Sequence, residues 1–352
     1  MDKRGRDQGP GSTTTIASEQ YSVTKHMNNL MGKLMWVVGT VAAAVAVAAP
    51  ASASKPTPAA LEPLATEAHI NDVAAAGERL IAVGERGIIL RSEDGEQWTQ
   101  VPSPVNVMLN AVTFADDRHG WAVGHDASIL HTADGGESWS VQAYGSNGDG
   151  NPFLDVLFTD AASGYAVGGF GMFMVTQDGG RTWSDLADPT LSERGVHLYD
   201  LLQLPDGTFA LVGELGLVAT SPDGLSWDIL DAPYEGSLYA ALPLGQRGLL
   251  MVGMRGNAFR TEDLSEPQWE AVPTGIEKPL FDLARLGNGR VAAAGRSEQV
   301  VVLETGKAPS RLELATRSGG VRMDDTFTVL LRWKGRLYAA TDSGVQPIAA
   351  LR

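Results

Sequence analysis

The fold is decided by the segment TADGGESW, residues 132–139. Three further polar turns of this kind end in a tryptophan, at residues 92–98, 176–183 and 221–227, and a looser copy covers 261–269. Their tryptophans follow one another at separations of 41, 44, 44 and 42 residues. A fixed period of about 40 residues in a strand-rich chain is typical of a β-propeller, in which each repeat forms one blade.

The chemistry of the turn explains why it repeats. The side chains of Thr132 and Asp134 can hydrogen-bond the free backbone groups of a tight bend. Gly135 and Gly136 supply the positive φ that a hairpin needs, and Trp139 opens the next strand with a large apolar ring. We therefore expect a structural, not catalytic, role for the turn residues, which are Asp94, Trp98, Asp134, Trp139, Asp178, Trp183, Asp223, Trp227, Asp263 and Trp269.

Short apolar runs bounded by Gly and Asp clusters predict seven units between residues 61 and 352. No stretch in this region has a sustained helical period. The sixth unit lacks the turn and its tryptophan, and the seventh ends after three strands. We predict an all-β chain with a single seven-bladed β-propeller of four-stranded antiparallel blades. The expected first strands begin at Ile70, Leu109, Phe153, Leu198, Leu238, Leu280 and Phe327.

The incomplete seventh unit predicts how the ring closes. Residues 61–64 and 70–73 are similar to the fourth strand and following first strand at 98–101 and 109–112. We therefore expect an N-terminal strand to complete the last blade, because this would remove its exposed edge.

The first 60 residues divide into three parts. Residues 1–30 are polar and predicted to be disordered, residues 31–53 have the pattern of a signal peptide, and residues 54–60 form a linker to the propeller at 61–352. A positive flank, an uncharged apolar run over 34–49 and a small-residue exit predict cleavage after Ala53. The alternative is a retained membrane anchor, although the run is short for one. Either way we expect an exported, periplasmic domain.

Composition excludes several classes of function. The 352 residues contain no cysteine, which excludes disulfides, thiolate metal sites and a cysteine nucleophile. The net charge is −15, and without residues 1–53 the chain retains 22 basic and 39 acidic residues. An acidic surface repels phosphate backbones and anionic membrane surfaces, so we expect no nucleic-acid partner. No cofactor is indicated, and we expect a monomer.

The turns resemble the Asp-box, or BNR repeat, of sialidase-type propellers. The longer patterns GWAVG (120–124) and GYAVG (164–168), each leading into a turn, resemble the photosystem II stability/assembly factor family. This resemblance covers about residues 65–305 and implies a seven-bladed propeller that helps to assemble a membrane complex. Related domains also occur in non-photosynthetic bacteria, so a photosynthetic role is not implied. The loose turn at 261–269 and the lost turn of unit six depart from the pattern.

Binding sites on this scaffold usually lie on the face opposite the Asp turns, where loops join second and third strands. These loops predict a docking surface with arginines for carboxylates and a phenylalanine anchor. An alternative is that these hairpin loops are merely polar. The candidate binding residues are Arg86, His125, Asp126, Phe170, Glu214, Arg255 and Arg296.

A second candidate is a column of first-strand carboxylates: Asp72, Asp155, Asp200 and Asp282. Near the channel mouth they could bind a cation or act as acid and base. Alternatively, they bond the backbone of the next blade. The connector 144–152 can be read as a calcium loop but lacks the terminal bidentate acid, so no metal is predicted.

Two functions from different classes remain. The first is a non-enzymatic scaffold or assembly factor that docks on a membrane protein or envelope complex. The second is a sialidase-like glycoside hydrolase, which needs an arginine cluster, a tyrosine nucleophile backed by glutamate, and an acid. The sequence favours the scaffold, because Tyr199 and Tyr239 have no evident glutamate partner and a fold does not imply an activity.

Overall fold

A computed structural model describes residues 55–145, 150–186, 188–296, 300–314 and 326–350. The predicted disordered extension (1–30) and signal peptide (31–53) lie outside these ranges. Within them, no helix is long and apolar enough to span a membrane.

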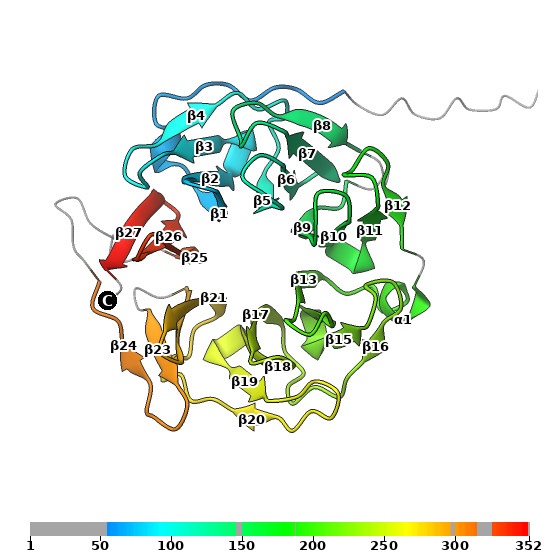
Figure 1. Cartoon of the computed structure of the whole chain (residues 1–352), viewed down its shortest axis with the longest axis vertical. Coiled ribbons are helices and arrows are strands. Elements are labelled where there is room, and N and C mark those ends of the chain that lie inside the picture. Colours follow the sequence, from blue (N-terminus) through cyan, green and yellow to red (C-terminus); the bar gives the residue numbers. More distant parts are fainter. Residues whose placement is uncertain (1–54, 146–149, 187, 297–299, 315–325, 351–352) are drawn as a thin grey trace, which may run out of the picture. The chain divides into compact units, whose positions relative to one another are not determined.

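Seven antiparallel sheets surround a central axis, each with its first strand innermost (Figure 1). Blade one contains β1 (Ile70–Ala76), β2 (Arg79–Gly84), β3 (Ile89–Ser92) and β4 (Thr99–Val101). Blade two contains β5 (Leu109–Phe114), β6 (Gly120–Gly124), β7 (Ser128–Thr132) and β8 (Ser140–Ala143). Blade three contains β9 (Phe153–Phe158), β10 (Gly164–Gly168), β11 (Phe173–Thr176) and β12 (Ser184–Asp185). Blade four contains β13 (Leu198–Gln203), β14 (Phe209–Gly213), β15 (Val218–Ser221) and β16 (Asp228–Ile229).

The remaining blades are less regular. Blade five contains β17 (Leu238–Leu244), β18 (Gly248–Gly253), β19 (Ala258–Thr261) and β20 (Glu270–Ala271). Blade six contains β21 (Leu280–Gly287), β22 (Arg290–Gly295), β23 (Val301–Glu304) and β24 (Ser310–Arg311). Blade seven contains β25 (Phe327–Trp333), β26 (Arg336–Thr341) and β27 (Gly344–Ala350). The predicted seven-bladed all-β propeller and the seven predicted first strands are confirmed. A short α-helix, α1 (Pro189–Ser192), follows blade three, and a 3-10 turn, η1 (Ala65–Glu67), precedes blade one.

The Asp turns have the predicted hydrogen bonds. In blade two, Asp134 Oδ1 accepts from the Thr132 hydroxyl at 2.7 Å and from the Ser138 N–H at 2.9 Å. The Thr132 hydroxyl oxygen accepts from the Gly136 N–H at 2.9 Å. Gly135 and Gly136 take φ values of 72° and 85°, which a side chain resists. The turn is therefore a structural device that joins the third and fourth strands.

Close packing explains why the second strand of blades one to five ends in a glycine that follows a valine, as in Val123-Gly124. The second residue of each first strand is a β-bulge, as between Leu109 and Ala111. The bulge brings the preceding carbonyl close to the end of the second strand, where a Cβ at Gly124 would collide with the Met108 carbonyl oxygen. Only glycine permits this close backbone approach.

Each turn tryptophan fills the space between its own blade and the preceding one. Trp139 of blade two packs with Ile81, Ile89 and Val101 of blade one, and Trp269 of blade five packs with Leu238 and residues of blade four. Trp139 and Trp227 are buried and the other three indoles are half-buried, so packing between neighbouring sheets makes a large apolar contribution to the ring.

The predicted N-terminal closing strand is wrong. Within the described residues, the last sheet has three strands, β25, β26 and β27. Residues 55–64 lie instead along the outside of blade one (Figure 1). There the Ala59 N–H donates to the Ser103 carbonyl at 3.0 Å, and the Glu62 N–H donates to Gln100 Oε1 at 2.7 Å. The similarity between residues 61–64 and an outer strand therefore does not lead to pairing with blade seven.

Side-chain packing closes the ring where blades seven and one meet. Trp333 and Tyr338 of blade seven pack with Ile70 and Leu80 of blade one in one apolar cluster. The Thr328 hydroxyl donates to the Ile70 carbonyl at 2.6 Å. Ion pairs at the periphery of this junction are Lys334–Glu78, Arg336–Glu96 and His69–Asp342, each 2.7 Å.

Candidate functional site: the loop face

One end of the ring carries the loops that join second and third strands, together with the first residues of the innermost strands. The pairing of Ile70 with Gly84 and of Leu198 with Gly213 shows that both features lie at the same end. We call this end the loop face. The Asp turns follow the third strands at the opposite end, as the sequence predicted, and we call it the Asp-turn face.

Four loops on the loop face share an unusual backbone. They are η2 (Glu85–Gly87), η3 (Gly169–Gly171), η4 (Glu214–Gly216) and η5 (Met254–Gly256). Their middle residues have φ between 53° and 59°, a left-handed conformation that disfavours side chains. None of the four middle residues is a glycine, and their side chains are exposed: Arg86, Phe170, Leu215 and Arg255. Strained non-glycine positions that point outward are a feature of functional loops.

The three predicted arginines are accessible to a partner. Arg86, Arg255 and Arg296 are exposed, and none forms a side-chain ion pair with another residue in the described part of the chain. Arg255 and Arg296 come from adjacent blades five and six, whereas Arg86 comes from blade one. Two of the arginines therefore lie on neighbouring blades, and the third lies farther around the ring.

The other predicted polar residues are partly engaged within the protein. Glu214 accepts from the His197 N–H at 3.2 Å, and Asp126 accepts from the Tyr144 hydroxyl at 2.9 Å. His125 is exposed beside Asp126, and Phe170 retains an exposed fraction of 60%. Phe170 and Leu215, the latter with an exposed fraction of 66%, occupy the same loop position on the adjacent blades three and four, and we call these two residues the apolar patch.

A row of rings continues from this patch along the channel mouth. Phe170 packs on His197 with centroids 4.8 Å apart, and His197 lies 6.0 Å from Tyr199. Tyr199 and Tyr239 are 5.1 Å apart, and Tyr239 and Phe281 are 5.3 Å apart. We call these five residues the aromatic arc. It covers blades three to six and reaches the loops of Arg255 and Arg296. The Met254 N–H donates to the Ser237 carbonyl at 2.9 Å, and the Arg296 N–H donates to the Pro279 carbonyl at 3.0 Å.

Sequence reasoning did not identify the aromatic arc as a site. Tyr199, Tyr239 and Phe281 are the bulge residues of three successive first strands. The sequence feature that could have revealed the arc is a leucine followed by an aromatic residue at the start of each of these strands. At the same position, blades one and two carry Asn71 and Asn110, whose side chains donate to the next blade. The mouth therefore has an aromatic side and a polar side.

The carboxylate column is structural. Each of its four aspartates accepts a hydrogen bond from the innermost strand of the next blade. Asp72 Oδ2 accepts from Val112 N–H at 2.8 Å, and Asp155 Oδ2 accepts from Leu201 N–H at 2.8 Å. The corresponding bonds from Asp200 to Ala241 and from Asp282 to Leu330 measure 2.7 Å and 2.6 Å. Each bond connects one blade to the next, as in the second of the two interpretations made from the sequence.

These four carboxyl groups keep high pKa values although parts of their side chains reach the channel. Burial is the largest cause and outweighs the backbone N–H bonds, which lower the pKa. The pKa rises to about 7 at Asp72 and Asp282 and to about 6 at Asp155, and that of Asp200 lies well above its usual value. Mutual repulsion within the column adds to the rise at Asp72 and Asp200.

The structure places the Glu214 carboxylate near the hydroxyl of Tyr199, a tyrosine that has no evident glutamate partner in the sequence. Burial, and then the Glu214 carboxylate, raise the pKa of the Tyr199 hydroxyl, whereas activation would require a lowered pKa. In the described residues, no group of three or more acidic or histidine side chains is arranged to hold a metal ion. The loop face carries exposed arginines and the exposed ring of Phe170 beside half-buried rings, a combination that suits the binding of a polypeptide.

Comparisons with known proteins agree with this geometry. The family model described as "Photosynthesis system II assembly factor YCF48" matches residues 90–152 and 149–318. The photosystem II stability/assembly factor HCF136 of Cyanidioschyzon merolae is 42% identical over 52 residues, which are 14% of this chain and 12% of that protein. The chain thus matches only about an eighth of that relative's length.

Solved structures share the fold. One described as YCF48 bound to D1 peptide superposes with a TM-score of 0.66 at 20% identity, covering 85% of this chain and 100% of the other. An ancestral GH74 enzyme superposes with a TM-score of 0.62 at 14% identity, covering 82% and 45%. At such identities the superpositions establish the propeller alone. The family model, by contrast, matches more than half of the chain, and the chain therefore belongs to the YCF48 photosystem II assembly factor family.

Proposed function

We propose that the protein is an exported, non-enzymatic assembly factor that binds an extended segment of a membrane protein on its loop face. The observation that carries this proposal is the aromatic arc beside Arg255 and Arg296 at the channel mouth. Membership of an assembly-factor family supports it, as does the D1 peptide held by a structurally similar protein.

The chemistry of the site favours an acidic segment with apolar side chains. Guanidinium groups form paired hydrogen bonds with carboxylates, and aromatic rings supply most of the binding energy of small interfaces. The protein is acidic as a whole, so cations gathered at one mouth would orient such a segment there. A strongly basic segment would bind poorly at this point, because the arginines would repel it.

The test is recovery of partners from detergent-solubilised native membranes by the tagged protein. A variant with Arg86, Arg255 and Arg296 changed to alanine is expected to lose most of the recovered partner. Arg181→Ala on the Asp-turn face is the matched control, since Arg181 is also exposed and bonds only the Asp178 carbonyl. Equal recovery by all three proteins would overturn the role of the arginines.

Export is part of the proposal and rests on the sequence of residues 31–53. Fractionation of the native cells, followed by N-terminal sequencing of the mature protein, tests it. A mature N-terminus after Ala53 in the periplasmic fraction is expected. A full-length protein in the cytoplasm would contradict export, and a full-length protein in the membrane would indicate the retained anchor.

Absence of enzymatic activity is likewise proposed. Glu214 lies near Tyr199, but burial and the glutamate charge raise the pKa of the tyrosine hydroxyl, which disfavours its activation as a nucleophile. A fluorogenic sialoside assay tests it: no turnover above buffer is expected, and turnover abolished by Arg255→Ala would establish the hydrolase.

A further inference from the structure

The junction between blades five and six lacks a turn tryptophan. In blades one to five, the residue before the outer strand is tryptophan, as at Trp269 before β20. In blade six this position, before β24, is Pro309. The strand pairings establish the equivalence, because Ser310 pairs with Val302 as Glu270 pairs with Arg260.

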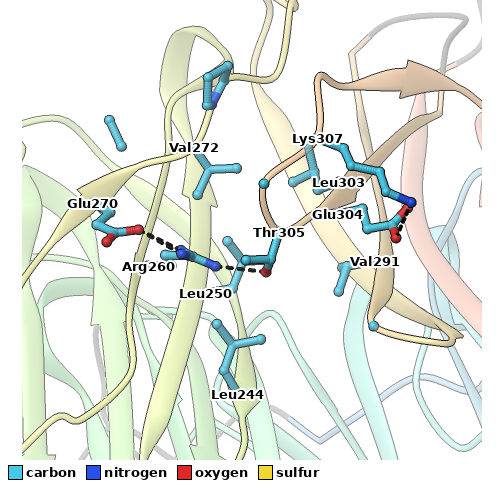
Figure 2. A pocket seen from close by; sticks show the side chains of 14 residues that line it. Leu244, Leu250, Arg260, Glu270, Val272, Val291, Leu303, Glu304, Thr305 and Lys307 are labelled. Atoms are coloured by element: carbon cyan, nitrogen blue, oxygen red, sulfur yellow. Dashed lines mark hydrogen bonds and ion pairs between the residues drawn. The ribbon is translucent and has the colours of Figure 1, made fainter.

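A cavity of about 210 Å³ lies where the missing indole would be (Figure 2). Its apolar walls come from Leu244, Leu250 and Val272 of blade five and from Val291 and Leu303 of blade six. We call it the vacant tryptophan slot. Pockets for drug-sized ligands usually exceed about 300 Å³, so this volume suits a single aromatic side chain.

The rim of the vacant tryptophan slot is polar and fixed. Arg260 donates to Glu270 Oε2 at 2.9 and 2.7 Å and to the Thr305 hydroxyl at 2.7 Å, which links the two blades (Figure 2). Lys307 pairs with Glu304 at 2.7 Å on the other side. A guanidinium held in this way presents a flat surface on which an aromatic ring can stack.

A hydrogen-bond acceptor for an indole is also present. In blade five, the Trp269 N–H donates to the carbonyl of Asp231 at 2.9 Å. The equivalent of Asp231, one blade later, is Pro273, which lines the slot. No donor within the described residues bonds the Pro273 carbonyl.

We propose that the vacant tryptophan slot binds an aromatic side chain, with tryptophan preferred, that a partner polypeptide presents. In five blades of this same chain, an indole that precedes the outer strand occupies the equivalent position. The slot lies toward the Asp-turn face, because the β23–β24 turn at Thr305 and Lys307 forms part of its rim. It is therefore separate from the loop face, and its failure would leave the proposed function intact.

The test uses the full chain and the capped peptide N-acetyl-Gly-(5-fluoro-Trp)-Gly-amide, observed by ¹⁹F NMR. Saturable binding is expected, with a dissociation constant on the order of 1 mM or tighter for one buried ring. Pro309→Trp should weaken binding at least tenfold, because its own indole would occupy the slot. Ser310→Trp is the matched control and should bind as the wild type does, because adjacent residues of a strand face opposite sides.

Val291→Phe provides a second block that leaves the β23–β24 turn unchanged, and it should also weaken binding at least tenfold. Absence of saturable binding by the wild-type chain would overturn the proposal. So would undiminished binding by both blocking variants, or binding of free 5-fluoroindole without binding of the peptide, which would indicate a small-molecule site.

Discussion

Four exposed side chains on the loop face sit at backbone positions that glycine would occupy with less strain. Phe170 has a φ of 58°, an exposed fraction of 60%, and is followed by Gly171. The left-handed conformation costs a side chain about 1–2 kcal/mol. Because little burial offsets this cost, the residue type at Phe170 is better explained by an external partner than by stability.

Replacement of Phe170 by glycine tests this interpretation. We expect Phe170→Gly to keep the free energy of unfolding unchanged or to raise it by about 1 kcal/mol, because the strain is relieved. Recovery of the membrane partner should fall. Urea denaturation measures the first effect, and Leu215→Gly is the matched comparison in the next blade. A loss of more than about 1 kcal/mol would show that the ring is a structural element.

At the scale of elements, the outer strand in each of blades one to five is preceded by a tryptophan, whose indole fills the junction with the preceding blade. Blade six departs from this rule at Pro309, and the vacant tryptophan slot is the result. The apolar walls of this slot therefore lack the indole that covers the corresponding walls at the junctions of blades one to five.

Pro309→Trp should strengthen the junction between blades five and six. We expect the melting temperature to rise by about 3–8 °C, since partial filling of the cavity would recover about 1–3 kcal/mol. Differential scanning calorimetry of the variant, with Ser310→Trp beside it, measures the effect. An unchanged or lower melting temperature of Pro309→Trp would mean that the turn cannot place an indole in the slot.

At the scale of the whole molecule, the four column aspartates connect blades around the channel and make stability depend on pH. Their pKa values are raised by burial, so the folded protein holds protons that the unfolded chain has released above about pH 4. The free energy of unfolding must then fall as pH rises from about 4 to 7. The lowered pKa of His131, caused mainly by burial, acts in the opposite direction. The aspartates with lowered pKa values also act in the opposite direction, but their effect is largely complete by about pH 5.

We therefore expect the melting temperature to fall by several degrees between pH 5 and pH 8. Asp72→Ala should reduce this slope, and the variant should fold because Ala111 occupies the equivalent position in blade two. The measurement is a series of thermal melts at constant ionic strength. A melting temperature that increases over this range, or an Asp72→Ala slope equal to that of the wild type, would contradict the prediction.

Ring closure is the other property of the whole molecule that can be tested. Removal of residues 55–64 should lower the melting temperature only slightly, because they contribute a few surface hydrogen bonds to blade one. Extending the deletion to residue 68 should lower it much more, since Ala65 and Ala68 are buried between blades seven and one. Equal effects of the two deletions would show that the outer segment, not this packing, holds the junction.

Sequence alone determined the repeat. The Asp turns, the Val-Gly pairs and the tryptophan period are local features, and each requires particular residues within a few positions, so the blade count followed from them. The arginines, too, could be assigned to one face, because strand alternation fixes where loops lie. The departure of blade six was visible as a missing tryptophan.

Features that depend on contacts between residues far apart in the sequence were decided only by the tertiary structure. The N-terminal segment resembles an outer strand, yet it lies on blade one, since blades seven and one already join through Trp333, Tyr338 and Ile70. The roles of Asp72 and its counterparts depended on which backbone N–H each could reach in the next blade. The aromatic arc and the vacant tryptophan slot lie between blades, where contacts come from residues about 40 positions apart that local sequence patterns do not relate to one another.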